Sequence, residues 1–430
     1  MTTPIVNSTS RTDYLKNCWL KYPAVRDLPT PYSLGRIETL TIRDQNSLEI
    51  ILDSQSTKFE VNDLFFQDKI KSHKPSQVLK VGDLIAIHLS DTNKVILMAP
   101  HEGSFELSKQ VLSYQKLWGD YLFYLRSFFK ERDFLEVHTP TLVACPGTEP
   151  FLESFEVELK FGSRKTKKYL PTSPELHLKK MLGLGFQKIY EIAKSYRNTE
   201  FSETHQPEFF MLEWYRAFVG LEDIEADICD LIQFLNLKMS KTQNVQPIQI
   251  VKKSMAELFL EKLNFKLTTT TSKKELEKLA CDLGLINKER AESFSWDEIF
   301  LLIFIEKIEY QWNPEQIMIV HSYPASQAAY SRLNAEGWGE RFELYWKGME
   351  LANAFHEVND PDIQTQRFNE DLKKKKENGL TVVDLDSEFI EMLKTGMPPS
   401  GGIAMGLERL FMALMGLKNF SEWKLFLHKP

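Results

Sequence analysis

The sequence has little cysteine, and what it has is widely spaced. Its four cysteines are Cys18, Cys145, Cys229 and Cys281, and none belongs to a Cys-x-x-Cys pair. Zinc cages and disulfide frameworks require closely spaced or paired cysteines. Neither is expected here, and the composition fits the reducing cytoplasm.

Long apolar runs are also missing. The most apolar stretch, IFLLIFI from Ile299, is too short to span a bilayer. The N-terminal residues MTTPIVNSTSRTD lack the charged leader and apolar core of a secretory signal. We therefore expect a protein that is neither secreted nor inserted in a membrane.

An excess of positive charge is absent as well. Against 53 Lys and Arg stand 60 Asp and Glu, a net charge of −7. Broad binding to nucleic acid depends on Lys and Arg that neutralise phosphates, so it is disfavoured, although a local basic site is compatible with this charge. Otherwise, 430 residues with 43% hydrophobic content indicate a globular protein of two or three domains.

Residues 1–105 are rich in short β-forming runs. Five of them, with a helical stretch near residues 63–71, predict a small OB-like barrel; the runs are GRIETLTIR, SLEIILDS, TKFEV, VGDLIAIHLS and KVILMAP. Such barrels often bind single-stranded nucleic acid, but twelve basic and twelve acidic residues leave no electropositive groove here. A structural or docking module is the preferred interpretation.

Residues 106–430 predict a larger α+β domain. After a linker at HEGSF, apolar residues from Leu107 to Phe128 recur at three- and four-residue spacing, as in an amphipathic helix. FLEVHTPTL predicts a strand that stops at Pro140, residues 187–218 predict two strands about a polar loop, and residues 221–311 predict a helical insertion. Strands resume with IMIVHSYPAS and the hairpin RFELYWKGMELANAFHEV. The expected architecture is an antiparallel sheet flanked by helices.

A run of four lysines, Lys373 to Lys376, lies in a predicted polar helix that begins near Asp362. We interpret the run as solvated helix surface. The alternative is a docking patch for an acidic partner.

Two arginines have sequence contexts that suit phosphate binding. Arg197 in YRNTEF ends a predicted strand, and Arg409 follows the glycine-rich turn of GGIAMGLERL. The planar guanidinium binds phosphate or carboxylate oxygens through two hydrogen bonds. An ordinary salt bridge is the alternative for each.

The predicted strand after the polar loop places Phe209, Met211, Glu213 and Tyr215 on one face. An aromatic platform beside hydrogen-bond acceptors would suit a ligand. Alternating strands also produce such faces as ordinary core, so both interpretations stay open.

The predicted hairpin is unusually acidic. Glu343 and Glu350 flank its Lys-Gly turn, and Asn353, Phe355 and Glu357 alternate along its second strand. Paired carboxylates that face a polyphosphate would hold Mg²⁺. Plain strand parity does not bring Glu343, Glu350 and Glu357 together, so a bulge has to intervene.

Other candidates have structural explanations. Thr172-Ser-Pro-Glu175 fits a helix capping box, which would account for Glu175. His205 and His356 belong to no cluster spaced for a transition metal. Walker, Rossmann, nucleophile-elbow and HExxH motifs are missing from the sequence, so an ATP site would have to be built otherwise.

Taken together and in this order, these segments resemble the class II aminoacyl-tRNA synthetases, and within them the lysyl branch. FLEVHTPTL resembles the first class motif, with Asp133 where a glycine is usual. YRNTEF through HQPEFFMLEWY resembles the second motif, and GGIAMGLERL the third. The resemblance covers residues 107–430 and implies a homodimer that forms through the first motif.

The resemblance also implies roles for the site residues. Arg197 would contact the ATP α-phosphate and the substrate carboxylate, Glu200 the adenine amine and His205 the distal phosphates, while Phe209 and Arg409 would enclose the adenine. Glu343 and Glu350 would hold Mg²⁺. A lysine-like substrate would be received by Ser173, Glu175, Glu213, Tyr215, Asn353, Phe355, Glu357 and Ala404. Gln206 and Ala354 stand where the family usually has asparagine and glycine.

Within this group the chain is most similar to the ligases that attach (R)-β-lysine to a lysine of elongation factor P. Ser173 and Ala404 follow the ligase pattern, where true synthetases usually have alanine and glycine, whereas residues 1–105 are extra. The resemblance implies a cytoplasmic, ATP- and Mg²⁺-dependent enzyme with elongation factor P, rather than tRNA, as its partner. Charging tRNA with L-lysine is the alternative, and an inactive, regulatory paralogue is a third possibility.

Overall fold

The computed structural model describes residues 32–43, 47–52, 58–62, 79–88, 95–99, 109–240, 246–328 and 330–428. The chain divides into two compact units, Met1–Lys109 and Gln110–Pro430. Cys18, the predicted helical stretch near residues 63–71 and the HEGSF linker lie outside the described residues. Within them, no helix is long and apolar enough to cross a membrane.

The first unit contains a five-stranded antiparallel sheet in the order β3-β2-β1-β4-β5. Alternate residues such as Leu48, Ile50 and Leu52 are fully buried on one face, as expected for strands with one apolar side. The strands are β1 (Tyr32–Ile42), β2 (Ser47–Leu52), β3 (Lys58–Asn62), β4 (Leu84–His88) and β5 (Val95–Ala99). The small β-rich module expected from the sequence is confirmed as an antiparallel sheet.

The second unit is built on an eight-stranded sheet in the order β11-β12-β13-β14-β15-β10-β9-β6. Its strands are β6 (Leu135–Glu136), β9 (Lys188–Tyr196), β10 (Glu208–Ala217), β11 (Ile250–Ser254), β12 (Ile317–Tyr323), β13 (Gly339–Trp346), β14 (Met349–His356) and β15 (Ser400–Gly406). The α+β class is confirmed.

The sequence had suggested a wholly antiparallel sheet, but the sheet is mixed. β11 pairs with β12 in parallel, and β6 pairs with β9 in parallel. In each case the two strands are joined through other elements rather than by a tight turn, and such crossovers permit parallel pairing. The six strands between these edges are antiparallel.

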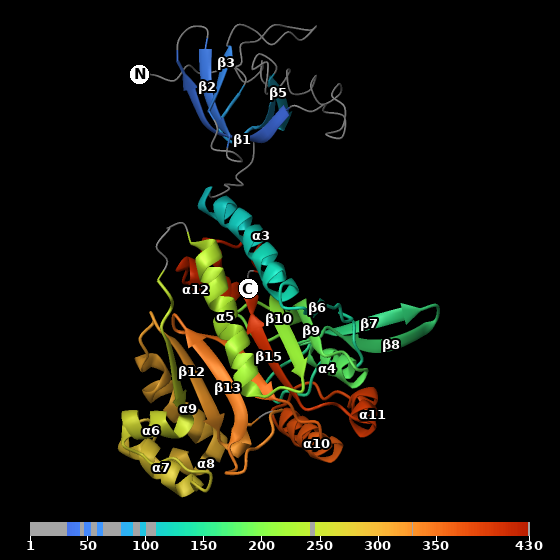
Figure 1. The fold of residues 1–430 in the computed structure, drawn as a ribbon, viewed down its shortest axis with the longest axis vertical. Helices are drawn as coiled ribbons and strands as arrows, with labels where there is room; N and C mark the ends of the chain where they lie inside the picture. The colour runs from blue at the N-terminus through green and yellow to red at the C-terminus, as the bar shows by residue number, and fades with distance from the viewer. Residues whose placement is uncertain are drawn as a thin grey trace. The chain divides into compact units, whose positions relative to one another are not determined.

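Three helices cover one face of the sheet (Figure 1): α3 (Lys109–Lys130), α5 (Leu221–Met239) and α12 (Leu407–Met415). Strand alternation explains which residues they meet. Leu212 and Trp214 of β10 are fully buried in the core below these helices, which leaves Phe209, Met211 and Glu213 on the opposite face.

The opposite face carries α4 (Glu175–Gly183), α10 (Pro361–Glu377) and α11 (Ser387–Thr395) near its β10 side, with an apolar core of their own. A two-stranded sheet, β7 (Glu156–Phe161) and β8 (Arg164–Tyr169), extends from the unit (Figure 1). Short 3₁₀ turns are found at Glu309–Gln311, Ala325–Gln327 and Phe420–Glu422.

Within the range expected as an insertion, the helices divide into two groups. α5 packs on the central sheet, whereas the following four form a separate apolar core with β12 and β13. These four are α6 (Met255–Leu263), α7 (Lys273–Asp282), α8 (Lys288–Ser293) and α9 (Trp296–Lys307).

Two local expectations were wrong. The strand expected to stop at Pro140 pairs only over Leu135–Glu136, although Val137 N–H still donates to Tyr190 O at 2.9 Å. The lysine run on α10 is not all solvated surface, because Lys375 is fully buried. Its ammonium lies 3.5 Å from the carbonyl oxygen of Glu149, under a loop that the sequence pattern could not place beside α10.

Candidate active site

A cavity of about 360 Å³ opens on the face of the sheet opposite α3, α5 and α12. Strands β10, β14 and β15 form its floor, and the loop after β9 closes one end. Of the residues predicted for the site, those that line the cavity are Ser173, Glu175, Arg197, Glu200, His205, Phe209, Glu213, Glu350, Asn353, Phe355, Ala404 and Arg409.

Arg197 immediately follows β9 and lies against the polar loop. Its guanidinium pairs with the Glu200 carboxylate at 3.3 Å and lies 5.2 Å from the centre of the Phe209 ring. Its Nε is buried and has no hydrogen-bond partner among the described residues. A buried cationic donor left unpaired at the cavity wall suits an anionic ligand.

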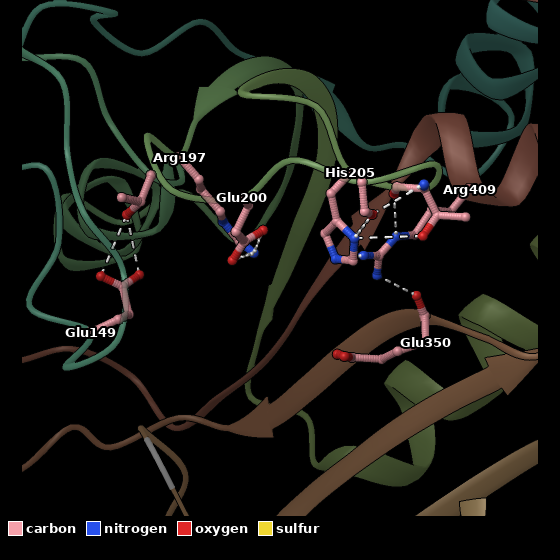
Figure 2. Close-up of polar contacts among 9 residues, drawn as sticks. Glu149, Arg197, Glu200, His205, Glu350 and Arg409 are labelled. Atoms are coloured by element: carbon pink, nitrogen blue, oxygen red, sulfur yellow. Dashed lines mark hydrogen bonds and ion pairs between the residues drawn. The ribbon is translucent and has the colours of Figure 1, made fainter. Parts of the chain in front are cut away.

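Arg409 lies in the first turn of α12 and joins three segments (Figure 2). Its Nη1 donates to Glu350 O at 2.8 Å, its Nε donates to Thr204 O at 3.3 Å, and its other Nη contacts His205 Nε2. Burial, together with the charge of Arg409, lowers the pKa of His205. The neutral imidazole can then accept from the guanidinium through Nε2.

The bulge that the acidic hairpin required is present. The β13–β14 register shifts between the pairs Leu344–Ala352 and Tyr345–Glu350, so Leu351 is the extra residue. This shift brings Glu350 onto the face of Asn353, which pairs with Glu343. Burial and the charge of Glu343 raise the pKa of Glu350 to about 7.

Glu343 does not line the cavity itself. Its carboxylate accepts from Tyr323 at 2.6 Å and also contacts Tyr345 and Arg341. Arg341 also donates to Asn353 Oδ1 at 3.0 Å. Glu350 has no ion pair among the described residues, so it is the carboxylate free to meet a cation.

Glu175 is the first residue of α4, but the capping box expected from the sequence is not formed. Pro174 occupies the N-cap position with no side-chain cap. The Thr172 hydroxyl bonds the carbonyl oxygen of Pro146 at 2.8 Å instead, because the TSPE segment is packed against that loop. Glu175 therefore has its side chain available for another partner.

That partner is Lys179, one turn along α4. Its ammonium lies 2.5 Å from both the Glu175 and the Glu357 carboxylates and is almost fully buried. Burial opposes its charge, but the two carboxylates outweigh this and raise the pKa of Lys179. Glu357 lies behind the cavity wall, where a Cβ on Gly402 would come within 2.2 Å of its Oε1.

Glu213 is fully buried on β10 and has one oxygen unused. Its Oε2 accepts from the Tyr215 hydroxyl at 3.0 Å, while Oε1 has no hydrogen-bond partner among the described residues. Burial raises the pKa of Glu213 well above its ordinary value, and that of Tyr215 as well. Ala404 on β15 pairs with both Glu213 and Asn353 and forms the floor between them.

Of the departures from the family pattern near the second motif and the hairpin, Gln206 lines the cavity and Ala354 does not. The Gln206 side-chain oxygen accepts from His428 N–H at 3.1 Å, tying the loop to the C-terminal segment. Ala354 is fully buried in the core on the other face of the sheet. His356 pairs with Glu340 at 3.0 Å and is not among the cavity residues.

Sequence reasoning missed two charged residues at this site. Lys179 neutralises two carboxylates, and Glu149 lines the cavity beside Ser173 and Glu175. The spacing of Glu175 and Lys179, four residues apart on a predicted helix, indicated that they could pair. No pattern placed Glu149 here, because its position depends on contacts with α10 and the TSPE segment.

Comparison with known proteins agrees with this geometry. Residues 108–429 match the family model described as tRNA synthetases class II (D, K and N). The chain belongs to this class II tRNA synthetase family. Two relatives share 34% identity, each aligned over 69% of this chain and 90% of the relative: the elongation factor P (R)-β-lysine ligases of Avibacterium paragallinarum and of Enterobacter sp. (strain 638).

The class II tRNA synthetase family gives the cavity its chemical context. The family model covers every residue that lines the cavity, from Glu149 to Phe420, and begins after the β-rich module. Among the described residues, no three His, Cys, Asp or Glu side chains cluster as a metal site.

Proposed function

We propose that this chain uses ATP to activate a lysine-like amino acid, (R)-β-lysine, and transfers it to a lysine side chain of elongation factor P. The observation that carries the proposal is that a single cavity brings Arg197 and Arg409 together with unpaired carboxylates. Such a cavity suits a polyphosphate beside a cationic amino acid. The two ligase relatives act, by their names, on that substrate and that acceptor.

ATP would bind where the arginines meet the polar loop. Phe209 and Arg409 both line the cavity and would enclose the adenine, while Glu200 would accept from its amino group. His205 would approach the distal phosphates. Arg197 would exchange its contact with Glu200 for the α-phosphate and the substrate carboxylate, which would satisfy its unpartnered Nε.

Glu350 suits Mg²⁺ bound jointly with a polyphosphate, and Glu343 would join it only by exchanging its contacts with Arg341 and two tyrosines. This ion binds through one or two carboxylates, together with phosphate oxygens and water. Glu350 has no ion pair among the described residues, and Glu343 lies near enough to raise its pKa. The ion would neutralise charge that develops on the phosphates as they separate.

The lysine-like substrate would occupy the other end of the cavity. Glu213, held by Tyr215, offers an unused carboxylate oxygen. Glu175 lines the same cavity, with Glu357 behind it, and the two carboxylates share the single positive charge of Lys179. Asn353, Phe355, Ser173 and Ala404 form the remaining contacts. The substrate carboxylate would then face Arg197, and its terminal ammonium group would face Glu213.

The reaction follows in two steps. A carboxylate oxygen of the amino acid attacks the α-phosphorus of ATP and diphosphate leaves, with Arg197 stabilising the added negative charge. An uncharged ε-amine of the acceptor lysine then attacks the acyl carbon, AMP leaves and an amide forms. The amine proton is lost to solvent or to a base that the geometry does not single out.

A second candidate, charging of tRNA with L-lysine, is favoured by one observation. The family model begins at residue 108, so the five-stranded module lies outside it. Small β-rich modules can bind RNA. With tRNA as acceptor, a ribose hydroxyl would attack the same acyl carbon and form an ester.

Substrate-dependent ATP–diphosphate exchange tests the proposal. Purified full-length protein would be assayed with (R)-β-lysine, L-α-lysine or neither, followed by transfer assays with elongation factor P or total tRNA. Exchange that favours β-lysine, followed by modification of the protein acceptor, is the expected result. Exchange with α-lysine and esterification of tRNA would establish the second candidate instead.

A further inference from the structure

Charge pairing divides the carboxylates of the cavity into two classes. Glu175 and Glu200 are engaged by Lys179 and Arg197, and the lining residue Glu408 by Lys424 at 3.2 Å. Among the described residues, the lining carboxylates without an ion pair are those of Glu149, Glu213 and Glu350. Three unpaired carboxylates facing one cavity suit cations supplied by the ligands, since an uncompensated buried charge is costly and burial raises the pKa of each of these groups.

Of these three carboxylates, only that of Glu149 has no part in the function proposed above. It lies in the loop before β7 and lines the cavity next to Ser173 and Glu175. Its carboxylate lies 3.2 Å from the Thr172 hydroxyl oxygen, which donates its proton to Pro146 O at the shorter distance of 2.8 Å. Figure 2 shows the Glu149 side chain. Burial raises the pKa of Glu149, whereas the charges of Arg197 and Lys375 lower it.

The structure positions this side chain closely. Gly147 has φ +136°, and a Cβ there would meet Glu149 Oε2 at 2.2 Å and the Thr172 hydroxyl at 2.6 Å. The buried ammonium of Lys375 lies 3.5 Å from the Glu149 backbone oxygen. Gly147 therefore leaves room for the Glu149 carboxylate beside Thr172, and Lys375 holds the Glu149 backbone.

We propose that Glu149 binds the ammonium group nearer the carboxylate of the amino-acid substrate, while Glu213 receives the terminal one and Glu350 meets the metal. This inference rests on the proposed function, which orients the substrate carboxylate toward Arg197. Glu149, Ser173 and Arg197 line the same cavity, and Glu149 and Ser173 also line a smaller neighbouring pocket together. Glu149 therefore faces the end of the substrate where β-lysine and α-lysine differ.

The position makes Glu149 a residue that determines specificity. In β-lysine the inner amine is one carbon further from the carboxylate than in α-lysine. A carboxylate packed over Gly147 and against Thr172 has little room to move, so it can favour one of these amine positions. A substrate without the inner amine, such as 6-aminohexanoate, would leave Glu149 unpaired and would bind poorly to the wild type.

Glu149→Gln tests this assignment, with KM values from ATP–diphosphate exchange as the readout. Loss of one charge-assisted contact should raise KM for (R)-β-lysine roughly 10- to 100-fold, with KM for ATP changed less than about threefold. 6-Aminohexanoate, assayed as a competitive inhibitor, should lose little or nothing. If 6-aminohexanoate does not inhibit the wild type, the comparison of KM for (R)-β-lysine with KM for ATP decides the assignment. A rise in the first without the second supports it.

Two further variants support the test. Glu156→Gln is the matched control, because Glu156 is exposed on β7 and pairs with Lys167 at 2.7 Å; it should match the wild type. Glu149→Asp retains the carboxylate on a shorter side chain, so its KM for β-lysine should lie between those of the wild type and Glu149→Gln. It replaces the Gln variant in the test if that variant does not fold.

Equal increases in both KM values, or equal weakening of β-lysine and 6-aminohexanoate, would show that Glu149 only supports the loop. An unchanged KM for β-lysine would likewise overturn the assignment. Absence of exchange with either lysine isomer in the wild type would instead refute the proposed function.

Discussion

At the scale of single residues, the site depends on which charges are already paired and which are left for ligands. Lys179 engages Glu175 and Glu357 before any substrate arrives, whereas Glu213 retains an unused oxygen and Arg197 an unused Nε–H. Side chains that are already paired with one another shape the cavity, and side chains that retain an unused donor or acceptor bind ligands. Substitutions of the paired side chains and of the unpaired ones should therefore differ in their effect on activity.

Arg197→Ala should nearly abolish amino-acid-dependent diphosphate exchange and leave the fold intact. A lost charge-assisted contact to the reacting phosphate costs about 2–4 kcal/mol in the transition state. Arg164→Ala, in the exposed β8 strand, is the matched control and should behave as wild type. Normal exchange by a folded Arg197 variant would remove that arginine from the site.

Ala404→Gly should shift selectivity toward L-α-lysine, more so when combined with Ser173→Ala. Ala404 forms the floor between Glu213 and Asn353, and a methyl-sized change in a packed pocket alters relative rates roughly tenfold or more. The measurement is the ratio of exchange efficiencies for the two isomers. A ratio unchanged from wild type would mean that Ala404 only packs the strand.

How far the site follows from sequence differs between residues. Arg197, Phe209 and Glu213 lie in motifs whose order identifies them and whose strand alternation gives their face. The Leu351 bulge could be inferred as necessary but not located, because parity shows a conflict without showing where it is resolved. Glu149 and Lys375 meet only through long-range packing, which no local spacing encodes.

At the scale of elements, backbone conformation explains one departure from the family pattern. Asp133 follows α3 with φ +61°, in the left-handed region that favours glycine. The resemblance indicates that glycine is usual at this position, and the positive φ explains why glycine is favoured there. Strand and helix periodicity likewise predicted β9, β10 and α10 closely, whereas the parallel edges β6 and β11 depend on crossovers that periodicity does not show.

Asp133→Gly should therefore stabilise the protein by about 0.5–1 kcal/mol. Relief of left-handed strain outweighs the extra chain entropy that glycine adds to the unfolded state. Urea unfolding would measure the change. Asp120→Gly, inside α3, is the opposite case and should destabilise by roughly 0.3 kcal/mol, the difference between the helix propensities of aspartate and glycine. Destabilisation by both substitutions would show that Asp133 is not strained.

At the scale of the whole molecule, exposed apolar residues near the first class motif support a homodimer. Phe123 on α3 and Leu135 on β6 are 65% and 50% exposed, and Leu142 follows in the same motif. Exposed large apolar side chains mark an interface where they form one patch, and these three lie in or next to the segment that resembles the first class motif. A two-fold interface through this motif would cover them.

Light scattering at micromolar concentration should give the mass of a dimer. Combined Phe123→Glu and Leu135→Glu substitution should give the mass of a monomer, because buried like charges would oppose pairing. Leu237→Glu, an exposed position on α5, is the control and should remain dimeric. A monomeric wild type would refute the interface.

Intact-mass spectrometry of elongation factor P is the most direct test of the function proposed here. The acceptor would be incubated with the full-length enzyme, ATP, Mg²⁺ and (R)-β-lysine, with Arg197→Ala as the inactive control. Addition of one lysyl group to one acceptor lysine, dependent on ATP and faster with β-lysine than with α-lysine, is the predicted result. An unmodified acceptor, in a reaction where total tRNA becomes charged with lysine, would contradict it.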